Sequence, residues 1–217
     1  MNLPLSDAEL RVLGSLIEKE ITTPDYYPLS LNALINACNQ KSNRQPVMLM
    51  DEAAVRDALE SLSEKRLAGA ISLAESRVTK YEHRTQEVFN FDRRSTAILC
   101  ELMLRGPQTP GELRSRTERM YRFDDLESLE GVLTKLAEHD PPLVKKLPRL
   151  PGTKEARYAQ LLGGERPEWT AAVVETAPSR PQPSDDRLTH LEAQVAQLAR
   201  QYEDLQQQFA QFKKQFE

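Results

Sequence analysis

The side chains of this sequence best suited to binding chemistry are basic, and they gather in short segments of the chain. Arginine can hold a phosphate group through two parallel N–H donors and lysine adds a point charge, so such clusters predict contacts with a nucleic-acid backbone. The candidate nucleic-acid-binding residues are Lys41, Asn43, Arg44, Arg77, Lys80, Arg84, Arg114, Arg116, Arg119, Arg122, Lys145, Lys146, Arg149, Lys154 and Arg157. For each of them the alternative is a solvated charge or the partner of a nearby acid, as Arg122 would be for Asp125.

Side chains that could catalyse a reaction or bind a metal ion are scattered along the chain. His83, His139 and His190 have no Cys, His or Glu partner at the spacing of metal ligands. Gly163-Gly164 is not followed by the Lys and Ser/Thr that complete a phosphate-binding loop. We therefore expect a protein that is not an enzyme and that has no catalytic residues, no metal and no cofactor.

The composition is that of a soluble globular protein, with 39% hydrophobic and 29% charged residues in a chain of 217. No apolar run approaches the ~20 residues that a membrane-spanning helix needs, and the first residues lack the basic and apolar stretches of a secretory signal. We expect a cytoplasmic protein with no membrane partner, in which Cys38 and Cys100 are buried thiols rather than a disulfide. The net charge of −4 lacks the basic excess of a dedicated nucleic-acid binder, so DNA binding would need a locally basic surface.

The elements that would position the basic residues can be read from capping residues and apolar spacing. Ser6 and Glu9 have the spacing of a capping box, which predicts the start of a helix, and Pro24 and Pro28 end it. The predicted elements are, in order, a helix from Ser6, a loop over 22–28, a helix from Ser30, a helix from about Met50 and a two-stranded hairpin over 67–73 and 78–91. Three helices followed by a hairpin are the order of a winged helix.

The same pattern then recurs, with the length changes confined to loops. Leu13 recurs as Leu99, Leu34 as Leu113, Leu59 as Leu133 and Tyr81 as Tyr158, at offsets of 86, 79, 74 and 77 residues. Such a repeat predicts two related domains, and the alternative is a pair of unrelated small helical domains. The predicted fold is α+β: mainly helical with small β-hairpins, in two tandem winged-helix domains with a C-terminal coiled-coil helix.

The end of the chain differs in character from the repeat. We expect one winged-helix domain over residues 1–91, a second over 92–165, a Pro-rich linker over 166–184 and a coiled-coil helix over 185–217. Apolar residues of the last segment alternate at spacings of three and four, which predicts a homo-oligomer, by default a homodimer; the alternative is a helix that packs back on the domains. The candidate oligomerisation residues are Leu188, Leu191, Val195, Leu198, Tyr202, Leu205, Phe209, Phe212 and Phe216.

Three stretches of the repeat look like a family signature. They are 23–34 (TPDYYPLSLNAL), 38–47 (CNQKSNRQPV) and 116–126 (RTERMYRFDDL). They resemble the YceH family, bacterial proteins of uncharacterised function, and the resemblance runs from about Leu5 to Leu162. It implies tandem winged helices and a proteobacterial cytosol, and it implies no reaction.

The third helix of each copy bears on the choice between DNA and protein as a partner. In a winged helix this helix normally enters the major groove of DNA. Here it opens with Asp51-Glu52 in the first copy and Asp124-Asp125 in the second, and these acids would face phosphates. We expect a non-enzymatic tandem winged-helix protein that binds double-stranded DNA, with a protein–protein adaptor that oligomerises through its last helix as the alternative.

Overall fold

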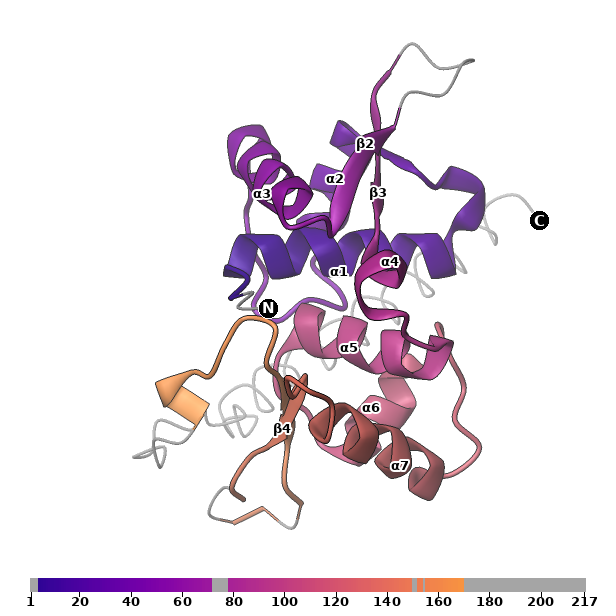
Figure 1. Ribbon diagram of the computed structural model, residues 1–217, viewed down its shortest axis with the longest axis vertical. Helices are drawn as coiled ribbons and strands as arrows, with labels where there is room; N and C mark the ends of the chain where they lie inside the picture. Colours follow the sequence, from indigo (N-terminus) through magenta and orange to yellow (C-terminus); the bar gives the residue numbers. More distant parts are fainter. Residues whose placement is uncertain (1–3, 72–77, 150–151, 154, 170–217) are drawn as a thin grey trace, which may run out of the picture. The chain divides into compact units, whose positions relative to one another are not determined.

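The computed structural model describes residues 4–71, 78–149, 152–153 and 155–169 (Figure 1). Every element reported below belongs to one compact unit, Met1–Ala172. The predicted coiled-coil residues, and most of the predicted linker, lie outside the described residues.

The first half of the described chain contains three long elements joined by short ones. Its elements are α1 (Asp7–Thr22), η1 (Pro24–Tyr26), β1 (Leu29–Ser30), α2 (Leu31–Cys38), α3 (Glu52–Glu64), β2 (Ala68–Ile71), β3 (Lys80–His83) and the short α4 (Thr85–Phe89). Ser6 and Glu9 form the predicted capping box of α1, and Ser30 and Asp51 cap α2 and α3. The strands form an antiparallel sheet in the order β1-β3-β2, with Tyr81 of β3 between Leu29 and Ala70.

The second half repeats this order with fewer strands. Its elements are α5 (Arg93–Arg105), α6 (Pro110–Thr117), α7 (Leu126–Ala137), β4 (Val144–Lys146), β5 (Tyr158–Gln160) and η2 (Pro167–Trp169). Thr109 and Glu112 form a capping box for α6, as Ser6 and Glu9 do for α1. An isolated bridge between Gln108 and Tyr158 occupies the place that β1 has in the first half, because the connection before α6 is shorter.

Helices α1 and α5 lie side by side and join the two halves (Figure 1). The approach is close at Gly14: a Cβ atom there would lie 2.9 Å from Cδ2 of Leu104. The Cys100 thiol donates a hydrogen bond to the Gly14 carbonyl oxygen at 3.3 Å. One hydrophobic core continues from residues such as Leu13 and Leu16 to Leu99 and Leu133. The two halves are therefore packed on each other rather than linked loosely.

The structure confirms the predicted α+β class, seven α-helices with small antiparallel sheets among the described residues. It also confirms that Cys38 and Cys100 are free and fully buried, and burial raises the pKa of the Cys38 thiol to about 11. The predicted strand over 78–91 is too long: pairing ends at His83, and Thr85–Phe89 forms α4, which Asn90 terminates with a φ of 47°. The division into winged-helix domains at residue 91 stays a prediction.

Candidate interaction surfaces and the arginine cluster

Arg44, predicted to contact nucleic acid, is buried inside the protein. Its side chain is 0% exposed and its Nη1 and Nη2 donate to the two carboxylate oxygens of Glu18 at 3.0 and 2.6 Å. Its Nε and Nη2 also donate to the carbonyl oxygen of Ala37, at 3.1 and 2.8 Å. In this position Arg44 offers no surface to a duplex, so the nucleic-acid contact predicted for it does not fit the structure. Its charge neutralises the buried Glu18 instead.

The second half contributes a matching set of charges. Arg119 Nη1 lies 2.5 Å from Glu18 and its Nη2 lies 2.7 Å from Glu101, so one guanidinium joins α1 to α5. Arg105 lies 3.1 Å from Glu101 and also donates to the Asn43 side chain. We call Glu18, Arg44, Glu101, Arg105 and Arg119 the arginine cluster.

The arginine cluster is buried between α1 and α5, and its guanidinium groups favour the ionised form of Glu18. Burial raises the pKa of Glu18, but the guanidinium groups of Arg44 and Arg119 lower it by more, so the pKa falls below its ordinary value. Both carboxylates of the cluster are fully buried. Two of the residues predicted to bind nucleic acid, Asn43 and Arg119, thus join the two halves, and a third, Arg44, neutralises Glu18 within the first half.

Three further predicted arginines differ in what they contact, and one of them orders the chain before α7. Arg114 donates to the carbonyl oxygens of Phe123 and Asp124, the latter at 2.7 Å. Arg116 donates to the side-chain oxygen of Gln108 at 2.8 Å and pairs with Glu112 at 3.1 Å. Arg122 is 81% exposed and lies 3.7 Å from Glu118, a more distant pair than the others and not the Asp125 pair anticipated as the alternative.

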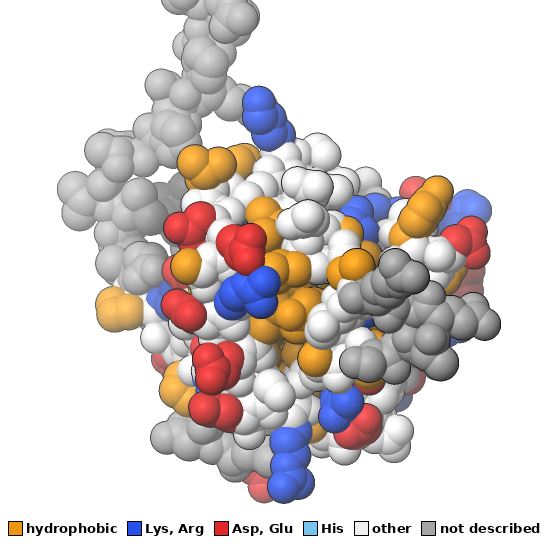
Figure 2. All heavy atoms as spheres, turned by 90° about the horizontal axis from the view of Figure 1, so that it is seen from above, with side chains coloured by type: hydrophobic (Ala, Val, Ile, Leu, Met, Phe, Trp, Pro, Cys, Tyr) orange, Lys and Arg blue, Asp and Glu red, His pale blue; other side chains and the backbone are white. Residues whose placement is uncertain are grey.

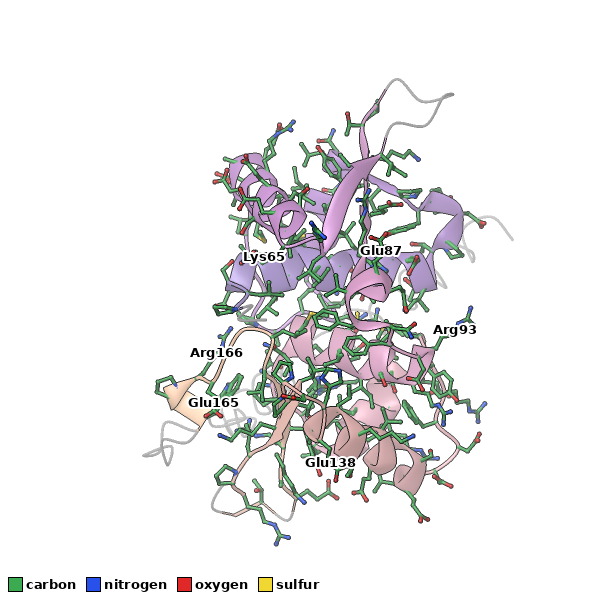
Figure 3. The ribbon with its side chains drawn as sticks, in the orientation of Figure 1. Lys65, Glu87, Arg93, Glu138, Glu165 and Arg166 are labelled. Atoms are coloured by element: carbon green, nitrogen blue, oxygen red, sulfur yellow. The ribbon has the colours of Figure 1, made fainter. Side chains whose placement is uncertain are left out.

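The predicted basic residues of the hairpins are distributed unevenly. Lys80 and Arg84 are half-buried, and Arg84 lies over Gly69 beside Glu82. Lys145 pairs with Glu165 at 2.7 Å, and both the Glu165 and the Arg166 side chains are seen on the segment after β5 in Figure 3. Among the predicted basic residues that the structure describes, those that are exposed or half-buried and have no ion pair are Lys41, Lys80, Arg114, Lys146, Arg149 and Arg157. Arg77 and Lys154 lie outside the described residues.

A groove lies between α3 and the strands β2 and β3. It has a volume of about 550 Å³, and its charged lining residues are Glu60, Glu64 and Arg56, beside Leu59 and Tyr81. Acidic side chains dominate the surrounding surface: the exposed residues of α3 include four carboxylates and one guanidinium, that of Arg56. In Figure 2, which looks down on the first half, red side chains gather along the side on which α3 lies. This groove would repel a phosphate backbone.

The equivalent groove of the second half is smaller and of mixed charge. It has a volume of about 170 Å³ beside Tyr158, and Lys146 and Arg149 line it together with Glu130 and Glu155. Tyr158 holds the same place here that Tyr81 holds in the first half, and Lys146 lies over its ring at 5.8 Å from the centroid. Lys146 and Arg149 thus give this hairpin two exposed basic side chains.

The loop before α3 exposes large apolar side chains that sequence reasoning overlooked. Leu49 is 96% exposed and Val47 is 57% exposed, and Tyr26 in η1 is 76% exposed. The signal for the loop was present in the sequence as four consecutive apolar residues, Val47-Met48-Leu49-Met50, between polar stretches. Adjacent exposed apolar residues are typical of contact surfaces for other macromolecules.

His83 belongs to a polar cluster that also eluded sequence reasoning. Its Nε2 lies 2.7 Å from Glu20 and its Nδ1 lies 2.9 Å from the Thr85 hydroxyl. The His83 backbone N–H donates to the Tyr27 hydroxyl at 2.7 Å. The hydrogen bond from His83 lowers the pKa of Glu20, and burial raises that of Tyr27. This cluster fastens the 22–28 loop to β3, which gives the loop a structural role.

No arrangement suited to metal catalysis is present where the structure can be described. Within residues 4–71, 78–149 and the shorter described segments, no group of three or more His, Cys, Asp and Glu side chains could hold a metal ion. No helix in the same segments has the length and apolarity to cross a membrane.

Comparison with known proteins places the chain among uncharacterised bacterial proteins. A family model described as "Protein of unknown function, DUF480" matches residues 5–153. A UPF0502 protein of Solibacter usitatus is 54% identical over 212 residues, which cover 96% of this chain and 100% of that relative. UPF0502 proteins of Aeromonas hydrophila (49% identical; 97% of this chain, 99% of that relative) and Citrifermentans bemidjiense (59%; 76% and 76%) are also similar. These matches confirm the resemblance that the signature stretches predict.

Proposed function

The chain belongs to the DUF480 family, and from its surfaces we propose that it is a non-enzymatic, cytoplasmic tandem winged-helix protein whose first half binds a basic segment of a partner protein. The winged-helix part of this proposal is supported by the order of elements in each half. Three helices are followed by an antiparallel strand pair, and a short strand or bridge before the second helix adds to that pair.

The charge of α3 is the observation that carries the choice of a protein partner. Glu52, Asp57, Glu60 and Glu64 are exposed on it, against the single cation Arg56, which is itself paired with Glu52 at 2.8 Å. A helix with a net charge of −3 from these side chains opposes insertion between two rows of phosphates. It attracts lysine and arginine side chains by the same field.

The apolar loop gives the partner a second kind of contact. Leu49 is separated from the first helical residue of α3, Glu52, by only two residues, so the exposed apolar side chains lie next to the acidic helix. Buried apolar anchors supply most of the affinity of protein interfaces, while rim charges favour the correct orientation. The proposed partner segment is therefore basic with at least one apolar side chain.

Reversing the charge of the groove tests this function. Full-length chain and a Glu60→Lys/Glu64→Lys variant would be used as bait in nuclease-treated extract of the source bacterium. We expect one stoichiometric partner on the wild-type chain and at least tenfold less of it on the variant, since each reversed charge repels a basic segment. Glu138→Lys, a reversal at an exposed site near the end of α7 (Figure 3), is the matched control and should leave retention unchanged. Equal retention by the groove variant, or a partner that is captured from untreated extract and absent from nuclease-treated extract, would contradict the proposal.

Double-stranded DNA is the second candidate partner, and the exposed Lys146 and Arg149 of the second hairpin favour it. Contacts from this hairpin would be to phosphates and therefore independent of base sequence. Binding to a genomic duplex should weaken steeply with salt, and a Lys146→Ala/Arg149→Ala variant should reduce the salt slope by about one for each contact removed. Absence of binding at low salt would exclude this candidate.

We also propose, from the heptad spacing alone, that the chain forms a homo-oligomer through its last helix. Leu198→Glu places a charge in the predicted seam and should dissociate the oligomer, because a buried unpaired carboxylate is unfavourable. Sedimentation of the full-length chain measures the result. An unchanged molecular mass would place oligomerisation elsewhere.

A further inference from the structure

A cavity of about 290 Å³ lies where α1, the loop before α3, the end of α5 and the segment around β5 meet. Its polar lining is mainly cationic: Arg11, Arg105, Arg157 and Arg166 contribute guanidinium groups, against the single carboxylate of Asp7. Its apolar lining comes from Leu10, Met48, Leu102, Met103 and Trp169. Both features belong to one cavity, so an occupant would meet positive charge and apolar surface together.

Two of the four positive charges are already balanced within the protein. Arg166 pairs with Asp7, and Figure 3 shows Arg166 on the segment after β5. Arg105 lies 3.1 Å from Glu101 in the arginine cluster. Neither Arg11 nor Arg157 has a carboxylate within ion-pair distance among the described residues. The lining therefore carries positive charge that the described protein leaves unbalanced.

Arg11 is the most unusual of these residues because it is almost completely buried, at 2% exposure. Its Nη1 and Nη2 donate to the carbonyl oxygens of Cys38 and Pro46, at 3.0 and 2.6 Å. Its buried Nε has no hydrogen-bond partner among the described residues. A buried guanidinium is costly unless an anion and hydrogen bonds compensate it. Carbonyl oxygens fix the orientation of Arg11, and they leave its charge uncompensated.

The size and lining of the cavity restrict what could compensate that charge. A volume of about 290 Å³ is near the lower limit of small-molecule sites, which are mostly apolar with a few fixed polar groups. Guanidinium groups pair with carboxylates in a planar, two-bond geometry. Leu10, Met103 and Trp169 offer the other end of a ligand an apolar surface.

We propose that this cavity binds a small organic carboxylate with an apolar body, its carboxylate held by Arg11 and Arg157. This site is separate from the α3–β2 groove, with which it shares no lining residue. The two proposals are therefore independent, and either one can be wrong while the other is right. Its loop residues Gln45, Pro46 and Met48 are continuous with the exposed Val47 and Leu49.

The only tryptophan of the chain, Trp169, lines this cavity and reports on it directly. Full-length protein would be titrated with cyclohexanecarboxylate, which does not absorb where tryptophan does, while Trp169 fluorescence and the thermal midpoint are followed. Cyclohexylmethanol keeps the apolar body without the charge, and inorganic phosphate keeps a charge without the body. We expect a saturable fluorescence change and a raised midpoint with the carboxylate, and binding at least tenfold weaker for both other probes.

Two substitutions locate the binding. Arg157→Gln, at a half-buried position of the cavity lining, should raise the Kd for cyclohexanecarboxylate about tenfold. Arg149→Gln, at an exposed position of the same hairpin outside the lining, is the matched control and should not change it. Arg11→Gln should abolish the binding where it folds, and Arg157→Gln keeps the test decisive where it does not. No saturable signal, equal binding of phosphate or of the alcohol, or equal Kd values for the two hairpin variants would overturn the proposal.

Discussion

Arg44 in the first half and Arg119 in the second both precede a third helix and both pair with a glutamate on a first helix, yet their surroundings differ. Arg44 is sealed against Glu18, with neither side chain exposed. Arg119 keeps 29% of its side chain exposed and divides its guanidinium between Glu18 and Glu101. The first pair stabilises its own half, whereas the second joins the two halves. The difference teaches that an arginine in the connection before the third helix can stabilise one half in the first copy and join the two halves in the second.

The outer surfaces of the halves differ in charge as well. Around Tyr81 the groove carries two carboxylates, Glu60 and Glu64, and one cation, Arg56, whereas around Tyr158 two cations are balanced by two carboxylates. A similar backbone therefore presents different electrostatic surfaces on its two copies. Variants that act on one half and spare the other can break or sharpen this comparison.

Glu18→Gln should have the largest effect, because it leaves Arg44 and Arg119 facing a neutral amide inside the protein. Removing one partner of a buried ion pair typically lowers the free energy of unfolding by about 3–5 kcal/mol. Urea denaturation followed by circular dichroism measures the change. Glu60→Gln, at an exposed position of α3, is the control and should stay within ~0.5 kcal/mol of wild type. Similar urea midpoints for the two variants would show that the ion pairs of the arginine cluster do not stabilise the fold.

Two glycine-to-alanine substitutions compare the contact between α1 and α5, where Gly14 lies, with the surface of the second half, where Gly131 lies. In Gly14→Ala the new Cβ would lie 2.9 Å from the buried Leu104 side chain, and overpacking of this kind costs about 1–3 kcal/mol, partly offset by a helix-propensity gain of ~1 kcal/mol. We expect a net loss of stability in thermal unfolding. Gly131→Ala, in α7 with no atom within 4 Å of its Cβ position, should instead raise stability by roughly 0.5–1 kcal/mol. A gain at both sites would mean that α1 and α5 are not closely packed.

Acid titration should reduce the difference between wild type and Glu18→Gln. The pKa of Glu18 in the folded protein lies below its ordinary value of 4.5, so the ionised carboxylate stabilises the fold above that pH. This contribution is lost as the pH falls through the lowered pKa, whereas the glutamine variant has no such group to titrate. Urea midpoints of both proteins measured between pH 7 and pH 3 (~0.5 unit apart) test the sign. A difference that grows on acidification would be the opposite result.

Arg122→Ala should have the smallest effect of the set. Its side chain is 81% exposed and its pair with Glu118 spans 3.7 Å, and exposed pairs of this kind contribute about 0–0.5 kcal/mol. The same substitution at Arg119 should destabilise the protein clearly more, because it removes one of the two guanidinium groups that pair with each of two buried carboxylates. Equal unfolding midpoints for the two variants would contradict the distinction between internal and surface arginines.

The parts of the fold that sequence could predict are those governed by local rules. Capping at Ser6 and the apolar spacing of α1 act within one turn or one helix face, so the start of that helix is legible in the sequence. The two-residue strand β1 is too short for any periodic signal, and the pairing of β1 with β3 joins residues about 50 positions apart. Overlooking β1 and α4 is thus a consequence of their length.

The fate of the basic residues could not be predicted from sequence for a related reason. Glu18 and Arg44 are separated by 26 residues, and they meet only because α2 and the following loop fold back on α1. Without the course of the chain in three dimensions, an arginine in a polar loop is predicted to be a charge on the surface. The same limitation hid the exposed position of Leu49, since burial is decided by tertiary packing.

The contact between Gly14 and Cys100 has a consequence for how the molecule responds to dilution. Gly14 and Cys100 are 86 residues apart, which is the offset of the repeat, so they occupy equivalent positions in the two halves. In a twofold dimer, equivalent residues of the two subunits touch in the same way where the axis passes between them. Here the two partners are segments of one polypeptide. Their effective concentration is therefore fixed by the short connection through α4 rather than by the amount of protein, and the joint between the halves should remain formed however dilute the chain becomes.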